Sequence, residues 1–206
     1  MTGESFSASK EKTKYFKIGN PIPWHWFSTS GVGESDVTVH AGSFDAAMKD
    51  AGIPNYNMVE YSSLLPSIAE RVDVPKNDIH GRRLDCIMAA STVKKGETAV
   101  AGLIKGDVYN NRGEHIGGLV AEHSDNFETE DAKKNLRTSL HEMFRIRYPK
   151  TYKIRNEEIL GLESTTATKK YATAVAVLGF VDYVLPVEGE LSLQNVRKLK
   201  PFVKHL

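Results

Sequence analysis

The sequence contains a single cysteine, Cys86, among 206 residues. One cysteine excludes a disulfide within the chain and a metal site built on cysteine ligands. Cys86 lies in the apolar run Leu84–Met88, which predicts a strand and an inert thiol in the core. Because proteins of reducing compartments rarely carry structural disulfides, we expect a cytoplasmic protein.

Long apolar runs and a strong charge of one sign are also missing. The N-terminus has no apolar run of signal-peptide length, and no segment approaches the roughly 20 apolar residues of a membrane span. The net charge is +1, whereas a broad nucleic-acid surface needs a clear basic excess. We therefore expect neither a membrane nor a nucleic acid as a partner.

Several common site motifs are absent. The 7 histidines include no pair with His-x-x-x-His spacing, so no metal site is predicted. The chain has no Gly-x-Ser-x-Gly of a serine hydrolase and no Gly-Lys-Ser/Thr of a phosphate loop. The glycines of Ser30–Ser35 are consequently predicted to form a turn and not a phosphate site.

The composition is that of a globular protein, with 40% hydrophobic and 26% charged residues. Residues 1–14 are polar and are predicted to form a disordered tail. Residues 15–190 are predicted to form one folded domain, and the basic, polar residues 191–206 a C-terminal appendage.

The expected elements are mostly strands, with two helices. One helix is predicted over residues 43–51, with Ser43 as N-cap, Asp45 in the first turn and Gly52 just after the end. The apolar spacing of Thr129–Tyr148 predicts a second, longer helix. Strands are predicted at 84–90, 97–104, 116–122 and 158–164. Residues 171–184 are predicted to form a fully buried strand, with a helix that turns into a strand as the alternative. The aromatic segment Pro21–Phe27 has two interpretations, a lid over the core or an oligomer contact.

The most informative stretch runs from Phe44 to Pro66. A short strand-like run, Asn57–Tyr61, leads into the pair Ser62-Ser63. Pro66 then ends regular structure, because proline has no N–H to donate. The two serines are therefore predicted to lie where a strand ends and the chain turns, a place suited to unusual backbone geometry.

Glu122 is a candidate acid. It ends the apolar run Gly117–Ala121, and desolvation in such a setting raises the pKa of a carboxyl group. A raised pKa is what a proton donor near neutral pH requires. The alternative interpretation from the sequence alone is an exposed glutamate at a strand end.

The stretch resembles the pyruvoyl-dependent arginine decarboxylases. The matching residues, at matching spacings, are Phe44-Asp45, Ala51-Gly52-Ile53, Asn57, Ser62-Ser63 and Pro66. Weaker similarity continues in residues 31–35, 117–122 and 172–183, so that the resemblance covers roughly residues 20–185.

The resemblance implies an α+β fold, a four-layer αββα sandwich of predominantly antiparallel sheets with packing helices. It implies self-cleavage between Ser62 and Ser63, which turns Ser63 into a covalent pyruvoyl group that condenses with the substrate amine. Glu122 is implied as the catalytic proton donor, Asn57 as a processing residue and Asp45 as the partner of the substrate guanidinium. Leu64, next to the future pyruvoyl group, is a candidate for the pocket wall.

The same resemblance implies a homo-oligomer, a trimer or hexamer of processed protomers with active sites between subunits. The expected reaction is decarboxylation of arginine to agmatine and carbon dioxide. Two alternatives remain open: decarboxylation of another amino acid, histidine or aspartate, by the same chemistry, and an unprocessed homologue without catalytic activity.

Overall fold

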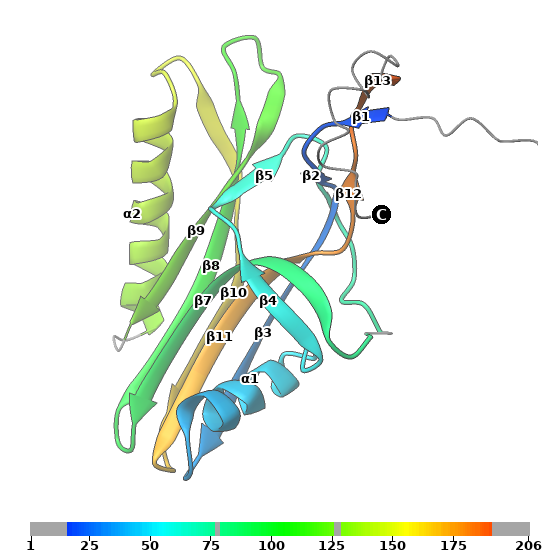
Figure 1. Ribbon diagram of the computed structural model, residues 1–206. Coiled ribbons are helices and arrows are strands. Elements are labelled where there is room, and N and C mark those ends of the chain that lie inside the picture. The colour runs from blue at the N-terminus through cyan, green and yellow to red at the C-terminus, as the bar shows by residue number, and fades with distance from the viewer. Residues whose placement is uncertain (1–15, 77–78, 126–128, 191–206) are drawn as a thin grey trace, which may run out of the picture. The chain divides into compact units, whose positions relative to one another are not determined.

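The computed structural model describes residues 16–76, 79–125 and 129–190 (Figure 1). The predicted tail, 1–14, and appendage, 191–206, lie outside these described residues. The chain divides into two units, one comprising Pro23–Tyr183 and the other residues 1–22 with 184–206. In the smaller unit β1 (Phe16–Ile18) pairs antiparallel with β13 (Val187–Glu190). The short strands β2 (Ile22–Pro23) and β12 (Tyr183–Val184) pair with each other.

Two sheets form the centre of the larger unit. The five-stranded sheet has the order β4-β7-β11-β3-β6 and the four-stranded sheet the order β10-β8-β9-β5. Pairs are antiparallel except β4 with β7 and β3 with β6, which are parallel. The strands are β3 (His25–Ser35), β4 (Tyr56–Glu60), β5 (Leu64–Pro66), β6 (Glu70–Arg71), β7 (Arg82–Lys94), β8 (Thr98–Tyr109), β9 (His115–Asp125), β10 (Lys153–Thr166) and β11 (Tyr171–Phe180).

Strand β11 is buried from Ala172 to Phe180 because both of its faces are covered. Successive side chains of a strand point to opposite faces. Ala176 and Leu178 pack in the core between the two sheets, with Leu103 from β8. Val175 and Val177 pack in a second core beneath the first helix. The apolar run of the sequence therefore predicted this buried strand correctly, although the strand ends at Phe180 and not at 184.

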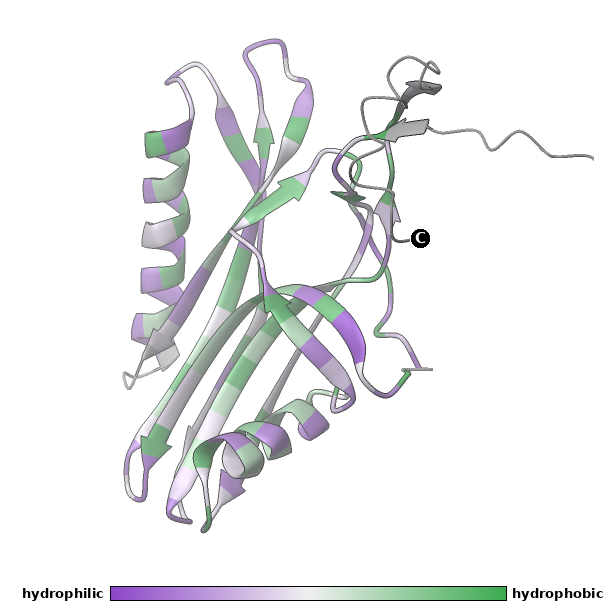
Figure 2. Cartoon of the chain, viewed as in Figure 1, coloured by the Kyte–Doolittle hydropathy of each residue, from purple (hydrophilic) through white to green (hydrophobic). Residues whose placement is uncertain are grey.

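One helix covers the outer face of each sheet (Figure 1). Helix α2 (Thr129–Arg147) packs Leu136 and Leu140 against Ile104 of the four-stranded sheet, and Figure 2 shows hydrophobic and hydrophilic residues alternating along it. Helix α1 (Asp45–Asp50) packs on the five-stranded sheet after a π-helical turn, Val39–Phe44. The result is the αββα arrangement that the resemblance implied.

The prediction of a glycine turn at Ser30–Ser35 is wrong, because these residues belong to strand β3. A Cβ atom added at Gly31 would lie 2.5 Å from the carbonyl oxygen of Ala47, and one at Gly33 would lie 2.3 Å from the nitrogen of Ala47. The two glycines are there because helix α1 crosses the strand at backbone contact distance.

Two smaller predictions need correction. Ser43 does not cap a helix: Phe44 occupies the N-cap position, and the buried Ser43 hydroxyl pairs with Thr173 Oγ1 at 2.8 Å. Within segment 21–27, Trp26 and Phe27 are themselves buried core residues of β3 and so do not belong to a lid over the core. Gly52, with φ of 77°, does follow the end of α1 as predicted.

Candidate active site

The serine pair lies on the segment that connects the two sheets. Strand β4 belongs to the five-stranded sheet and β5 to the four-stranded sheet, so residues 61–63 cross from one to the other (Figure 1). On one side the Tyr61 N–H donates to the carbonyl oxygen of Cys86 at 2.7 Å. On the other side the Val120 N–H donates to the carbonyl oxygen of Ser63 at 3.0 Å. The predicted end of a strand just before the serines is confirmed, since β4 ends at Glu60.

A tight turn is centred on Ser63. The Leu64 N–H donates to the carbonyl oxygen of Ser62 at 2.6 Å, a hydrogen bond between residues i and i+2 that defines a γ-turn. A donor on this oxygen polarises the carbonyl that precedes Ser63. It also lies where negative charge develops if a nucleophile attacks the carbonyl carbon.

Glu122 and Ser63 are joined by a hydrogen bond. The Ser63 hydroxyl donates to Glu122 Oε1 at 2.9 Å. Glu122 is an exposed residue, yet desolvation of the covered part of its side chain raises its pKa. The Ser63 hydrogen bond lowers this pKa and the charge of Glu60 raises it further, so the net direction is upward. The sequence-based expectation of a raised pKa is confirmed.

The other candidate residues lie at different distances from this pair. Leu64 adjoins Ser63 and is 41% exposed, facing Leu119 across the β5–β9 pair. Asn57 donates to the carbonyl oxygen of Gly81 at 2.7 Å, near the start of β4 and five residues, roughly 16 Å of extended chain, before Ser62. Asp45 is exposed on α1, which covers the outer face of the five-stranded sheet. One chain thus brings Ser63, Leu64 and Glu122 together and leaves Asn57 and Asp45 apart from them.

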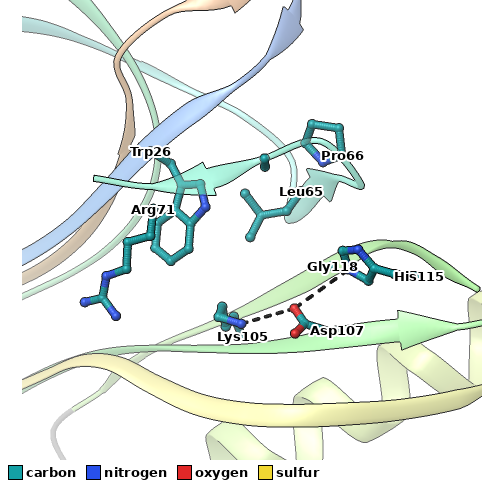
Figure 3. A pocket seen from close by; sticks show the side chains of 9 residues that line it. Trp26, Leu65, Pro66, Arg71, Lys105, Asp107, His115 and Gly118 are labelled. Carbon is teal, nitrogen blue, oxygen red and sulfur yellow. Dashed lines mark hydrogen bonds and ion pairs between the residues drawn. The ribbon is translucent and has the colours of Figure 1, made fainter. Parts of the chain in front are cut away.

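A cavity of about 170 Å³ extends along β5 beyond the serine pair (Figure 3). Leu65 and Pro66 form one wall, and Arg71 lies over the ring of Trp26 at 5.4 Å. Its other lining residues are Ala69, Lys105, Asp107, His115 and Gly118. The Lys105–Asp107 ion pair, 3.1 Å long, faces this cavity. These two residues were not singled out from the sequence, although two charges at alternate positions of the apolar β8 segment were a signal for them.

Sequence reasoning also missed a buried carboxylate beside the serine segment. Asp85 is 5% exposed and accepts hydrogen bonds from Arg83, Tyr61 and Tyr183. The available signal was a single charged residue inside the apolar run Leu84–Met88.

Within the described ranges no cluster of three or more potential metal ligands occurs. None of the helices described has the length and apolar content needed to cross a membrane.

The groups that converge at this site are a serine hydroxyl, a polarised carbonyl and a partly desolvated carboxyl. Such a set fits acyl transfer within the chain followed by proton transfer.

Comparison with known proteins defines the class. Residues 25–185 match the family described as pyruvoyl-dependent arginine decarboxylase. A protein of that name from Methanopyrus kandleri is 30% identical over 77% of this chain and 97% of its own length. Another, from Pyrococcus abyssi, is 31% identical over 67% of this chain and 84% of its own length. Pyruvoyl-dependent arginine decarboxylase AaxB of Chlamydia abortus is 30% identical over 80% of this chain and 94% of its own length.

These matches agree with the αββα fold described above. The chain belongs to the pyruvoyl-dependent arginine decarboxylase family. The prosthetic group of this family is a covalently bound pyruvoyl group.

Proposed function

We propose that this protein is a pyruvoyl-dependent arginine decarboxylase that converts arginine to agmatine and carbon dioxide after cleaving itself between Ser62 and Ser63. The observation that supports this best is the hydrogen bond from Ser63 to Glu122, 2.9 Å long, in a chain of this family. Ser63 is at once the nucleophile of the cleavage and the source of the prosthetic group.

In the cleavage step the Ser63 hydroxyl oxygen attacks the carbonyl carbon of Ser62, while Glu122 accepts the hydroxyl proton. The Leu64 N–H stabilises the charge that develops on the Ser62 oxygen, which it already contacts at 2.6 Å. Collapse of the adduct breaks the amide bond, protonates the Ser63 nitrogen and leaves an ester. Loss of the Ser63 Cα proton then expels the Ser62 carboxylate and leaves a dehydroalanine. Addition of one water releases one ammonia and leaves a ketone on the chain 63–206, separate from the chain 1–62.

The site fits the pyruvoyl group because that group retains the backbone position of Ser63, within reach of Glu122. When formed, it supplies an electrophilic ketone that condenses with an amino acid and accepts the electron pair released with carbon dioxide. Glu122 then donates a proton to the α-carbon of the substrate. Its raised pKa suits this role, since a protonated carboxyl must persist close to neutral pH.

Substrate choice in this proposal rests on Asp45. A carboxylate accepts paired N–H donors from the planar guanidinium in a bidentate geometry, whereas an ammonium offers a point charge. Because Asp45 lies on the helix layer outside the five-stranded sheet, we propose that the site is completed by Asp45 of a second protomer. A trimer, or a hexamer of two trimers, is the corresponding assembly. Asn57 is proposed to assist processing and Leu64 to line the pocket.

The proposal includes a cytoplasmic location for the protein. Cys86 is fully buried, and burial raises the pKa of its thiol to about 12, so that it is inert. A cytoplasmic location is consistent with this thiol.

The substrate is tested with a panel of arginine, lysine, ornithine, histidine and aspartate, measured as released carbon dioxide per pyruvoyl group. We expect arginine to be turned over fastest. Faster turnover of histidine or aspartate contradicts the substrate while leaving the pyruvoyl chemistry intact. Failure of the wild-type chain to split contradicts the chemistry itself and favours a non-catalytic homologue.

A further inference from the structure

The residue before the serine pair, Tyr61, is held by Asp85. Asp85 lies on β7, and its carboxylate is 5% exposed. Its Oδ1 accepts from Arg83 Nε at 2.6 Å. Its Oδ2 accepts from the Tyr61 hydroxyl at 3.0 Å and from the Tyr183 hydroxyl. Three donors from three segments of the chain therefore converge on one buried carboxylate.

Tyr61 immediately precedes the serine pair and is fixed in three ways. Its N–H donates to Cys86, its hydroxyl donates to Asp85, and its ring lies against the ring of Phe180 with centroids 5.7 Å apart. Because only one residue separates Tyr61 from Ser63, these contacts limit how the Ser62 peptide unit can rotate. On the far side Ser63 is fixed by Val120.

We propose that Asp85 is a positioning residue of the self-cleavage reaction: by holding the Tyr61 hydroxyl, it keeps the Ser62 carbonyl carbon in line with the Ser63 hydroxyl. This inference rests on the proposed function, since it concerns the same cleavage. Asp85 acts through Tyr61 and has no role in the later decarboxylation.

Stability alone does not account for a charge at this position. The ion pair of Asp85 with Arg83 adds little to stability, because the Arg83 side chain is 64% exposed and solvent screens the attraction. Burial disfavours the Asp85 charge, yet hydrogen bonds from Tyr183, Arg83 and Tyr61 outweigh it, so the pKa of this carboxyl is lowered. The group is therefore ionised near neutral pH, where it can only accept hydrogen bonds and so must orient its donors.

Orientation matters for this reaction because attack within the chain depends on the approach of the hydroxyl to the carbonyl carbon. Misplacement of reacting atoms by about 1 Å slows a reaction by about a hundredfold. Tyr61→Phe keeps the ring and its contact with Phe180 and removes only the hydroxyl. Tyr183→Phe is the comparison variant, since it removes a hydroxyl from the same Asp85 oxygen but keeps the hydrogen bond from the Tyr61 hydroxyl to Asp85.

The experiment follows cleavage of freshly synthesised full-length chain after a pulse of labelled methionine, for wild type, Tyr61→Phe, Tyr183→Phe and Asp85→Asn. We expect Tyr61→Phe to lengthen the half-time of cleavage by about tenfold, and Tyr183→Phe to stay close to wild type. Asp85→Asn should slow cleavage at least as much as Tyr61→Phe. The fully cleaved fraction of each variant should decarboxylate arginine at the wild-type rate per pyruvoyl group.

The double variant Tyr61→Phe/Asp85→Asn separates positioning from a general loss of stability. If Asp85 acts through Tyr61, the double variant should cleave no more slowly than Asp85→Asn alone. The inference is overturned if Tyr61→Phe cleaves at the wild-type rate, or if Tyr61→Phe and Tyr183→Phe slow cleavage equally. Because neither outcome depends on Asp85→Asn, the test holds even if that variant does not fold. A wild-type chain that never splits overturns the proposed function and not this inference alone.

Discussion

The serine segment has a carboxylate on each side, and the two are set in opposite chemical states. Glu122 is exposed and meets one donor, the Ser63 hydroxyl at 2.9 Å, and its pKa is raised. Asp85 is almost fully buried and meets three donors, and its pKa is lowered. Burial disfavours the charge of both groups. At Asp85 three donors, one of them the cation Arg83, outweigh burial, whereas at Glu122 one donor does not, and the charge of Glu60 adds to the effect of burial.

The difference separates two tasks. A carboxyl group with a raised pKa exchanges a proton near neutral pH and can serve as base and then as acid. A carboxylate saturated by donors holds its charge and its geometry. One side of the segment is therefore suited to chemistry and the other to alignment, and substitutions on the two sides should affect different steps.

The largest effect is expected from Ser63→Ala, which removes the reacting hydroxyl between the two carboxylates. The chain should remain a single piece on a denaturing gel and should release no carbon dioxide from arginine. Ser62→Ala is the matched control, because Ser62 contributes only its main-chain carbonyl, and it should still split. Cleavage of the Ser63→Ala chain contradicts the assigned nucleophile.

Glu122→Gln tests the carboxyl group that is proposed to transfer protons. In protein that has already been cleaved, turnover of arginine should fall by about a hundredfold, the scale of one general acid. Turnover is normalised to pyruvoyl content, because Glu122 is also proposed to assist the cleavage. Near-normal turnover removes Glu122 from the decarboxylation step.

Asp45→Asn extends the comparison to a third carboxylate, one proposed to bind substrate. Because the amide keeps the size but loses the charge, the KM for arginine should rise by about tenfold or more, and cleavage at Ser63 should be unchanged. Asp50→Asn removes the same charge from the same helix and should leave KM near its wild-type value. An equal rise of KM in both variants points to a general charge effect and contradicts the Asp45 contact.

The smallest effect concerns acid stability. The folded-state pKa of Asp85 lies below its ordinary value of 3.8, so its contribution to the free energy of unfolding is present above that value and lost as pH falls through the folded pKa. Asp85→Asn should therefore weaken the pH dependence of the unfolding midpoint below about pH 4. Parallel midpoint curves for the two proteins contradict the lowered pKa.

The fold was predictable where local pattern decided it. Helix α2 was predicted within one residue of its observed end, because its apolar residues recur with helical periodicity. The apolar run at 171–184 predicted a buried strand, which the structure has at Tyr171–Phe180. Gly31 and Gly33 misled the prediction, since they permit close contact with a helix whose position is set by tertiary packing.

The site was predictable only in part. Ser63 was found through the family resemblance of its stretch, and Glu122 through its apolar context together with that resemblance; the structure joins the two residues by a hydrogen bond. The Asp85 cluster was not found, because Tyr61, Arg83 and Tyr183 meet only when β7 and the segments around it are assembled. A single Asp in an apolar run predicts a buried charge, but it does not identify the residues that donate hydrogen bonds to that charge.

The most direct measurement is the mass of the purified wild-type protein under denaturing conditions. The account predicts two chains, 1–62 and 63–206, of which the second is lighter by one ammonia than the same chain beginning with serine. Ser63→Ala should give one chain of full-length mass. A single wild-type chain of full-length mass after prolonged incubation, or a second fragment that begins with unmodified serine, contradicts the account.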